Sequence, residues 1–304
     1  MYQAFLKEIK SFLDPDQILC REPMKHHTSF RVGGPADYFI RVNTEAQLAK
    51  LVPLLQQNGL PYFILGKGSN LLVSDEGYRG VVLLPEGEFR KIEAKEIRIL
   101  AGAAVSMNKA AETAAEKGLT GLEFASGIPG TIGGGLVMNA GAYGGEMGQV
   151  VESARVMDAL GRIRLLGKEE LQLGYRSSIF KKERLIILQV VLRLKPGNRE
   201  EILKTMEQYT KARREKQPLE YPSAGSTFKR PEGHYAGKLI MEAGLKGACV
   251  GGAQVSPKHC GFVINRDNAT AKDIRLLMEK IQAGVWECFQ VRLEPEVIFV
   301  GEEH

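Results

Sequence analysis

The sequence predicts an α+β protein of three consecutive parts: two small α/β subdomains followed by a C-terminal α+β domain. Three observations predict this class. The 304 residues exceed one average domain of about 150 residues. Short apolar strands alternate with amphipathic helical segments over the first two thirds of the chain. A Pro-Gly-Asn turn at residues 196–198 then precedes a region richer in long helices. We expect domain boundaries at 1–85, 86–196 and 197–304.

The first subdomain is expected to open with an amphipathic helix over residues 2–13, where apolar side chains recur at helical spacing. A second helix should begin after Thr44, a residue suited to capping, and end before Gly59. Strands are expected at residues 36–42, 61–65, 71–74 and 80–84.

The second subdomain is expected to begin with a strand at 97–101 and a helix at about 106–117, whose four alanines permit close packing. Further strands are expected near 150–158, 161–166 and 185–194. In the C-terminal domain we expect helices at about 199–216, 236–243 and 270–290, with strands at 261–264 and 296–300.

Glycine is the compositional outlier, at 34 of 304 residues against an average of about 7%. Eleven of these glycines lie between residues 118 and 148. A globular chain concentrates glycine where its backbone must turn left-handed or approach another group closely. The segment therefore predicts a binding loop.

Charge, cysteine content and hydropathy exclude several classes of function. The net charge of +5 comes without a long Lys/Arg stripe interleaved with aromatic residues, so we expect no nucleic-acid partner. The four cysteines have neither zinc-site nor disulfide-framework spacing. The sequence opens without a secretory leader, and no apolar run reaches the roughly 18 residues of a membrane helix. We expect a cytoplasmic protein with no metal, no membrane contact and no obligatory protein partner.

A first candidate binding loop follows the strand expected at 61–65. A Rossmann fingerprint would need glycine where Leu71 stands, and a P-loop would need glycine where Pro61 stands, so neither motif is present. The loop nevertheless offers bare backbone amides, a hydroxyl and a carboxamide, which suit a pyrophosphate. An ordinary tight turn is the alternative. The residues of this candidate loop are Gly66, Lys67, Gly68, Ser69 and Asn70.

The second candidate loop lies inside the glycine-rich segment. A proline between two glycines fixes a rigid turn, and the glycines beyond it let backbone lie against a flat or charged ligand. A turn cluster with only a packing role is the alternative. The candidate contacts are Gly127, Ile128, Pro129, Gly130, Thr131, Ile132, Gly133, Asn139 and Gly141.

Together the two loops resemble the FAD-binding loops of the UDP-N-acetylenolpyruvoylglucosamine reductase family, which belongs to the vanillyl-alcohol-oxidase-like flavoproteins with a PCMH-type FAD-binding module. The resemblance runs from about residue 25 to 300 and includes four further motifs in the family's order. These are Thr-Ser-Phe-Arg-Val-Gly-Gly-Pro-Ala at 28–36, Tyr-Arg-Ser-Ser at 175–178, Gly-Ser-Thr-Phe-Lys at 225–229 and Leu-Glu-Pro-Glu-Val at 293–297.

The resemblance implies a reaction and its cofactors. Non-covalent FAD would take a hydride from NADPH and pass it to C3 of a UDP-linked enolpyruvyl ether, and a proton added at C2 would complete UDP-N-acetylmuramate for peptidoglycan synthesis. NADPH and the UDP-sugar substrate would use one site in turn. Because no segment after Arg176 corresponds to the substrate-covering insertion, the chain resembles the type II branch.

Three residues are implied to carry the second half of this reaction. Arg176 would hold the substrate carboxylate with a planar, permanent charge. Ser226 would give the proton to C2, and Glu296 would lie at the carboxylate of the enolate. A structural ion pair, a turn serine and an exposed strand carboxylate are the respective alternatives. Glu294 is the nearby competitor of Glu296.

The diphosphate of the substrate would meet a set of cations that the resemblance places near the third domain's motifs. These are Arg213, Lys216, Lys229 and Arg230. Arg230 departs from one branch of the family, which has asparagine at that position.

Two rival interpretations stay open. An FAD-dependent oxidase of the same fold, acting on an alcohol or lactone, would share both glycine loops but would not need the set formed by Arg176, Ser226 and Glu296. A non-catalytic nucleotide-binding module is the third interpretation.

Overall fold

The computed structural model describes residues 2–301 and confirms the α+β class. Contacts divide the chain into two compact units. Unit 1 takes residues 1–20, 38–66 and 80–212, whereas unit 2 takes residues 21–37, 67–79 and 213–304. Two short N-terminal segments thus join the C-terminal residues, and the three consecutive domains stay a prediction. Of the hydrophobic cores, two lie in unit 1 and one in unit 2.

The first core of unit 1 includes the buried face of α2 (Glu45–Gln57). This helix begins where expected, because Thr44 Oγ1 accepts a hydrogen bond from the Gln47 amide. The neighbouring sheet has the order β1–β2–β5–β3, and β3 and β5 are parallel. The bounds of its strands are Ile18–Pro23, Pro35–Val42, Tyr78–Pro85 and Tyr62–Ile64.

The helix expected at residues 2–13 is shorter than predicted: α1 spans Tyr2–Ile9. Ser11 Oγ donates to the Glu8 carbonyl oxygen at 2.7 Å, which competes with the helical ladder. Pro15 follows and begins a separate 3₁₀ turn. Residues 10–13, which the apolar spacing assigns to the helix, therefore form a turn after α1.

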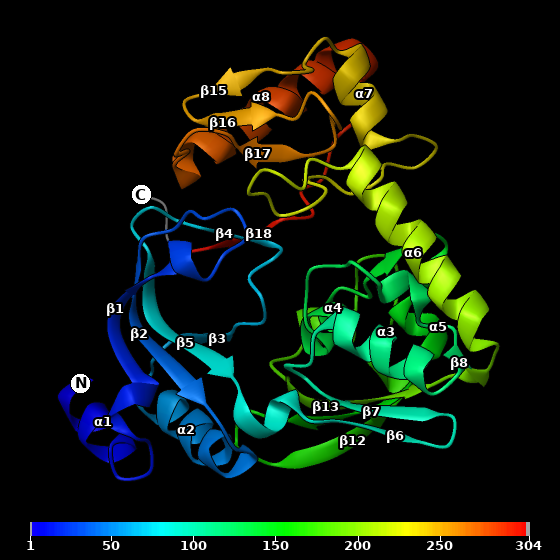
Figure 1. The fold of residues 1–304 in the computed structure, drawn as a ribbon. Helices are drawn as coiled ribbons and strands as arrows, with labels where there is room; N and C mark the ends of the chain where they lie inside the picture. The colour runs from blue at the N-terminus through cyan, green and yellow to red at the C-terminus, as the bar shows by residue number, and fades with distance from the viewer. Residues whose placement is uncertain (1, 302–304) are drawn as a thin grey trace. The chain divides into compact units, whose positions relative to one another are not determined.

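The second core of unit 1 lies on an antiparallel sheet of order β12–β11–β13–β7–β6, with α3 and α4 over one of its faces (Figure 1). The strand bounds are Ile163–Gly167, Val151–Met157, Ile186–Arg193, Arg98–Gly102 and Ile92–Lys95. The helices are α3 (Met107–Glu116), α4 (Ile132–Val137), α5 (Met147–Val150) and α6 (Arg199–Lys216). Two small pairs complete this part: β8 (Leu119–Thr120) with β14 (Lys195–Pro196), and β9 (Gly141–Ala142) with β10 (Gly145–Glu146).

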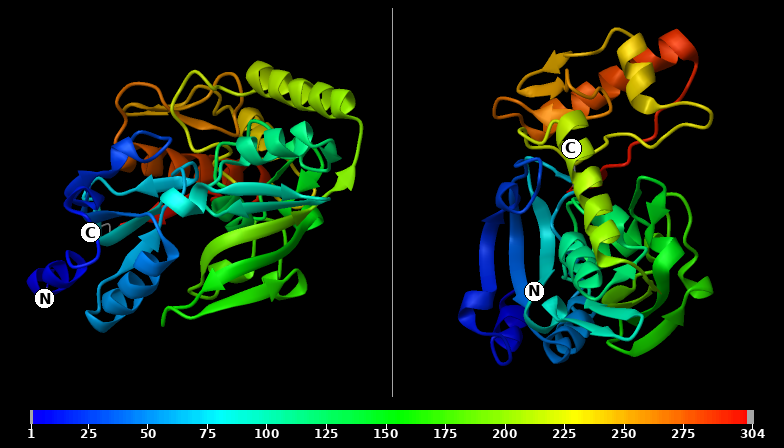
Figure 2. Two further views of the ribbon diagram at one scale, coloured as in Figure 1. Left: turned by 60° about the horizontal axis from the view of Figure 1, so that its bottom comes forward. Right: turned by 45° about the vertical axis from the view of Figure 1, so that its right-hand side comes forward.

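Unit 2 pairs an early segment of the chain with its last strand, because β4 (Leu71–Val73) and β18 (Ile298–Val300) run parallel. Its antiparallel sheet consists of β15 (Cys249–Val250), β16 (Ala253–Val255) and β17 (Val263–Asn265). The long helix α8 (Ala271–Phe289) lies along one face of that sheet, with α7 (Ala236–Glu242) beside it (Figure 2). The carboxylate of Asp75 accepts from the backbone amides of residues 271 and 272 and so caps α8.

Candidate functional site

The first glycine loop is held by close backbone contacts. Within unit 1, a Cβ built on Gly66 would come 2.9 Å from Thr131 Oγ1, so this glycine lies against the second loop. Within unit 2, Gly68 has a left-handed φ of 58°, and a Cβ there would clash with the His27 carbonyl oxygen. The Ser29 amide also donates to the Gly68 carbonyl oxygen at 3.1 Å. Only glycine fits at position 68.

The second glycine loop contains a helix that the sequence did not predict. Residues 127–131 form the turn, but α4 begins at Ile132 because Thr131 Oγ1 accepts from the Gly134 amide at 3.2 Å. Three glycines in six residues weaken the sequence signal for this helix. Burial of Ile132 and Leu136 in the core outweighs that propensity.

Arg176 lies on a two-residue turn of unit 1. Gly174 and Ser177 exchange backbone hydrogen bonds of 3.1 Å in both directions, so Tyr175 and Arg176 occupy the tip. Arg176 has a left-handed φ of 52°. Its Nη2 reaches the Gly141 carbonyl oxygen at 3.5 Å, and its guanidinium lies 5.2 Å from the centroid of the Tyr175 ring. The structure thus brings Arg176 to Gly141 of the glycine-rich segment.

Asn139 anchors this turn through its side chain. The carboxamide is 1% exposed; its Nδ2 donates to the Gly174 carbonyl oxygen at 3.0 Å, and its Oδ1 accepts from the Gly148 amide at 2.8 Å. Both polar atoms of the Asn139 side chain thus have hydrogen-bond partners within the protein. The cofactor contact predicted for Asn139 stays a prediction, and its backbone is the part that could make it.

Two further anchors of the Arg176 turn were missed by sequence reasoning. Buried Ser178 donates from Oγ to the Val137 carbonyl oxygen at 2.7 Å. Lys181 Nζ donates to the Arg176 carbonyl oxygen at 2.8 Å. Ser178 closes the Tyr-Arg-Ser-Ser motif, but the spacing of the motif does not show which carbonyl group its hydroxyl meets.

Ser226 and Glu296 lie on neighbouring backbone segments of unit 2. The Glu296 amide donates to the Thr227 carbonyl oxygen at 2.9 Å, and Phe228 forms a β-bridge with Pro295. Ser226 is exposed and follows Gly225, whose φ of 75° favours glycine. The strand expected at 296–300 begins two residues later, because residues 295 and 296 pair with this segment instead.

The carboxamide of Asn70 belongs to the same group. Its Nδ2 donates to the backbone carbonyl oxygen of Glu296 at 3.0 Å. The structure therefore brings the end of the first glycine loop, Ser226 and Glu296 together within unit 2. Lys67 and Ser69 belong to this unit as well.

The cations predicted for the diphosphate are distributed along residues 213–230. Lys229 makes a 2.8 Å ion pair with Glu294, and the hydrogen bond from Lys229 lowers the pKa of that carboxyl. Arg230 stacks 4.0 Å from the centroid of the Tyr235 ring, and Arg213 donates to Gln217. Lys216 is exposed. Glu294, the competitor of Glu296, is thus engaged in an ion pair. The contacts with the diphosphate stay a prediction.

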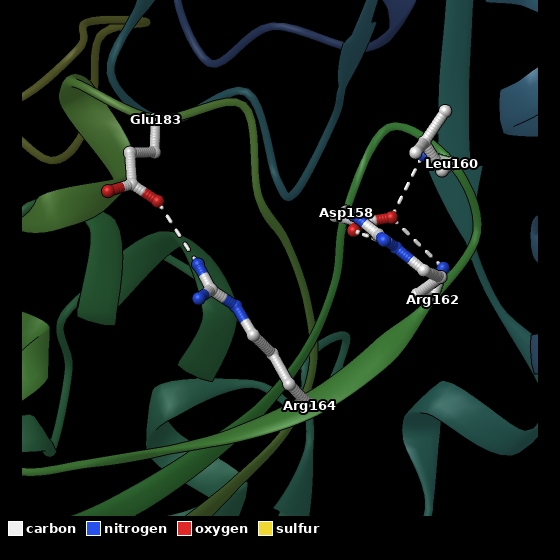
Figure 3. Close-up of polar contacts among 5 residues, drawn as sticks. All are labelled: Asp158, Leu160, Arg162, Arg164 and Glu183. Atoms are coloured by element: carbon white, nitrogen blue, oxygen red, sulfur yellow. Dashed lines mark hydrogen bonds and ion pairs between the residues drawn. The ribbon is translucent and has the colours of Figure 1, made fainter.

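Two hollows are lined by residues outside the two predicted glycine loops. One of about 290 Å³ in unit 2 is lined by α8 and β18. The other, of about 550 Å³ in unit 1, lies beside β12 and contains three arginines. Figure 3 shows that two of them are paired there: Arg162 with Asp158 at 2.8 Å and Arg164 with Glu183 at 3.1 Å. These two arginines thus have acidic partners on the protein itself.

Within residues 2–301, no group of three or more His, Cys, Asp or Glu side chains is arranged to hold a metal ion. None of the helices in this range is both long and apolar enough to cross a membrane.

His259 supports the segment that carries Thr227. Its Nδ1 accepts from the Gly261 amide at 3.1 Å, and the Gly261 carbonyl oxygen accepts from the Thr227 amide at 2.9 Å. Burial lowers the pKa of His259 because it disfavours the charged ring. A proton on Nδ1 would also remove the acceptor that Gly261 uses.

Two family descriptions match parts of the chain. Residues 36–167 match the family described as FAD binding domain. Residues 217–300 match the one described as UDP-N-acetylenolpyruvoylglucosamine reductase, C-terminal domain.

Complete relatives give the same result. A protein of Lachnoclostridium phytofermentans named UDP-N-acetylenolpyruvoylglucosamine reductase is 49% identical over 100% of this chain and 99% of its own length. One of the same name from Caldanaerobacter subterraneus subsp. tengcongensis is 49% identical over the whole of both chains. The crystal structure of UDP-N-acetylenolpyruvylglucosamine reductase from Thermus caldophilus aligns with a TM-score of 0.81 at 37% identity, over 93% of this chain and 98% of that one. The family resemblance and the FAD-binding fold predicted from the motifs are confirmed.

Asn139→Ala should destabilise the protein, because it leaves the half-buried Gly174 carbonyl and Gly148 amide without their shared partner. Each such group costs about 1–3 kcal/mol. Chemical denaturation measures the free energy of unfolding. Asn268→Ala is the matched control, since Asn268 is exposed and also has a positive φ, of 48°. Equal losses for both variants would assign the effect to backbone strain and contradict the anchoring role.

The depressed pKa of His259 predicts a stability that is present above its ordinary pKa of about 6.5 and is lost as the pH falls through the lower folded-state value. Denaturation midpoints between about pH 7.5 and 5.5 should therefore fall less steeply in His259→Gln, which can accept the Gly261 bond without titrating. His234→Gln removes an exposed histidine and should keep the wild-type slope. An unchanged slope in His259→Gln would contradict the assignment.

Proposed function

The chain belongs to the UDP-N-acetylenolpyruvoylglucosamine reductase family, and from this premise we propose that it reduces UDP-N-acetylglucosamine-enolpyruvate to UDP-N-acetylmuramate, using FAD and NADPH, as a step of peptidoglycan precursor synthesis. The observation that carries the proposal is the 49% identity to reductases over the full length of the chain. Agreement over every part of the chain supports the whole activity and not the FAD-binding fold alone.

The residues of both glycine loops fit FAD. Within unit 1, exposed Gly134 at the start of α4 leaves backbone that a pyrophosphate or a flat ring could approach closely. Gly66 and Gly68 instead let their loop pack closely on the protein itself, which fixes the loop for binding. When bound, FAD supplies the hydride chemistry of both half-reactions. The protein supplies binding, orientation and the charges that the substrate requires.

Arg176 is proposed to bind the carboxylate of the enolpyruvyl group. Addition at C3 leaves negative charge that is shared between C2 and that carboxylate, so a fixed cation stabilises the charged species more than the ground state. The anchored turn supports this role, because the backbone around Arg176 is fixed by Asn139 and Lys181. Pre-organised charge does not have to reorganise as the substrate reacts.

Ser226 is proposed to donate the proton to C2, and Glu296 to lie at the enolate carboxylate. A hydroxyl is a weak acid, but a carbanion is a strong base, so the transfer is feasible. Exposure of Ser226 and the open space around Gly225 support access by a substrate. The cations Arg213, Lys216, Lys229 and Arg230 are proposed for the diphosphate, with NADPH using the same site in turn.

The overall reaction predicts a specific sequence of colour changes. NADPH added without oxygen should bleach the flavin absorbance of the FAD-loaded protein, and UDP-N-acetylglucosamine-enolpyruvate should restore it. Stopped-flow absorbance measures both phases. Recovery with oxygen but not with the enolpyruvyl substrate would favour the oxidase interpretation, and a protein that takes up no FAD would favour the binding module.

Ser226→Ala should leave flavin reduction by NADPH within about threefold of wild type. Loss of a positioned proton donor should slow reoxidation by the enolpyruvyl substrate by about 10²–10⁴-fold. Single-turnover kinetics separate the two phases. Ser11→Ala, at an exposed serine of unit 1, controls for the loss of a hydroxyl. Equal slowing of both phases would make Ser226 a structural residue.

A further inference from the structure

Asn70 connects the first glycine loop to the segment that carries Glu296. It is the last residue before β4, and Glu296 stands two residues before β18, the parallel partner of β4. We propose that Asn70 is a positioning residue: its side chain fixes Glu296 for the second half-reaction, in addition to any contact that its loop makes with FAD. The inference rests on the proposed function, because it assigns a role toward the same substrate carboxylate.

Asn70 makes two hydrogen bonds to the backbone of residues 296–298. Asn70 Nδ2 donates to the Glu296 carbonyl oxygen at 3.0 Å, and the Asn70 carbonyl oxygen accepts from the Ile298 amide at 2.9 Å. In a parallel pair, the backbone N–H of one residue would normally make the first of these bonds. The carboxamide therefore adds one rung to the ladder just beyond the point where the strands end.

The opposite side of Glu296 is fixed by backbone. Its amide donates to Thr227, and the Lys229 amide donates to the Glu294 carbonyl oxygen, both at 2.9 Å. Backbone pairing thus sets the register of Glu296 against the segment of Ser226. On the opposite side, the Asn70 side chain donates to the Glu296 carbonyl oxygen. A point mutation can remove this hydrogen bond without removing a backbone hydrogen bond.

The donor is essential to this role. An aspartate at position 70 would have the same size but would present an oxygen to the Glu296 carbonyl oxygen, so two acceptors would face each other. The backbone at Glu296 would then shift away from Asn70. A displacement of about 1 Å from the reacting geometry can cost about 10²-fold in rate.

A purely structural role makes a different prediction. Loss of an ordinary hydrogen bond would lower stability by about 0.5–1.5 kcal/mol without distinguishing the two half-reactions. A role confined to FAD would lower retention of the cofactor but leave the FAD-loaded fraction with normal kinetics. The half-reactions and the FAD content therefore separate the three possibilities.

The test uses the full-length, FAD-loaded protein and its variants Asn70→Asp, Asn70→Ala and Asn70→Gln. Flavin reduction by NADPH should remain within about threefold of wild type. Reoxidation by UDP-N-acetylglucosamine-enolpyruvate should slow by about 10–100-fold in Asn70→Asp and Asn70→Ala, and Asn70→Gln, which keeps the donor, should recover part of this loss. Ser69→Ala perturbs the same loop and is expected to change FAD retention without the kinetic split.

A double variant checks that the effect acts through Glu296. Asn70→Asp should slow reoxidation far less when Glu296→Gln is already present, because the group it positions has been removed. Additive losses, equal slowing of both half-reactions, or normal reoxidation in FAD-loaded Asn70→Asp would each overturn the proposal. Failure of the proposed function itself is distinguishable, since the wild-type protein would then not be reoxidised by the enolpyruvyl substrate.

Discussion

Backbone packed directly against backbone is the constraint on which the binding loops of this protein depend. In unit 2, a side chain at Gly34 would clash with the Asp75 carbonyl oxygen, and one at Gly77 would clash with that of Pro35. The contact between Gly68 and His27 continues the same pattern. Close packing of the backbone therefore requires glycine at these three positions, independently of any ligand.

The side chains proposed for catalysis are positioned by backbone geometry more than by ion pairs. Arg176 has a left-handed conformation, which costs about 1–2 kcal/mol for a residue with a Cβ, and the anchors around its turn offset that cost. Glycine provides the unusual φ immediately before Ser226, and Glu296 is held in a short ladder. Hydrogen bonds between fixed backbone segments thus hold each of these side chains within its own unit.

Sequence reasoning predicted most long elements and the motifs, because hydrophobic periodicity and turn residues are local properties. It missed α4, since buried packing of Ile132 outweighs three glycines. It also missed β1, β6, β16 and the two-residue strands, because their pairing depends on other parts of the chain. The hydrogen bonds of Asn70 and Asn139 were also out of reach. A carboxamide shows its chemistry in the sequence, but its partners are set only by the folded backbone.

The paired arginines beside β12 have a consequence for behaviour in concentrated solution. This strand forms one edge of its sheet and exposes two large apolar side chains, Ile163 and Leu165. Exposed edges of this kind invite pairing with a strand of another molecule. Arg162 and Arg164 alternate with those apolar residues, and association would strip water from both charged pairs. The charged pairs thus disfavour pairing of this edge with a second copy of the chain.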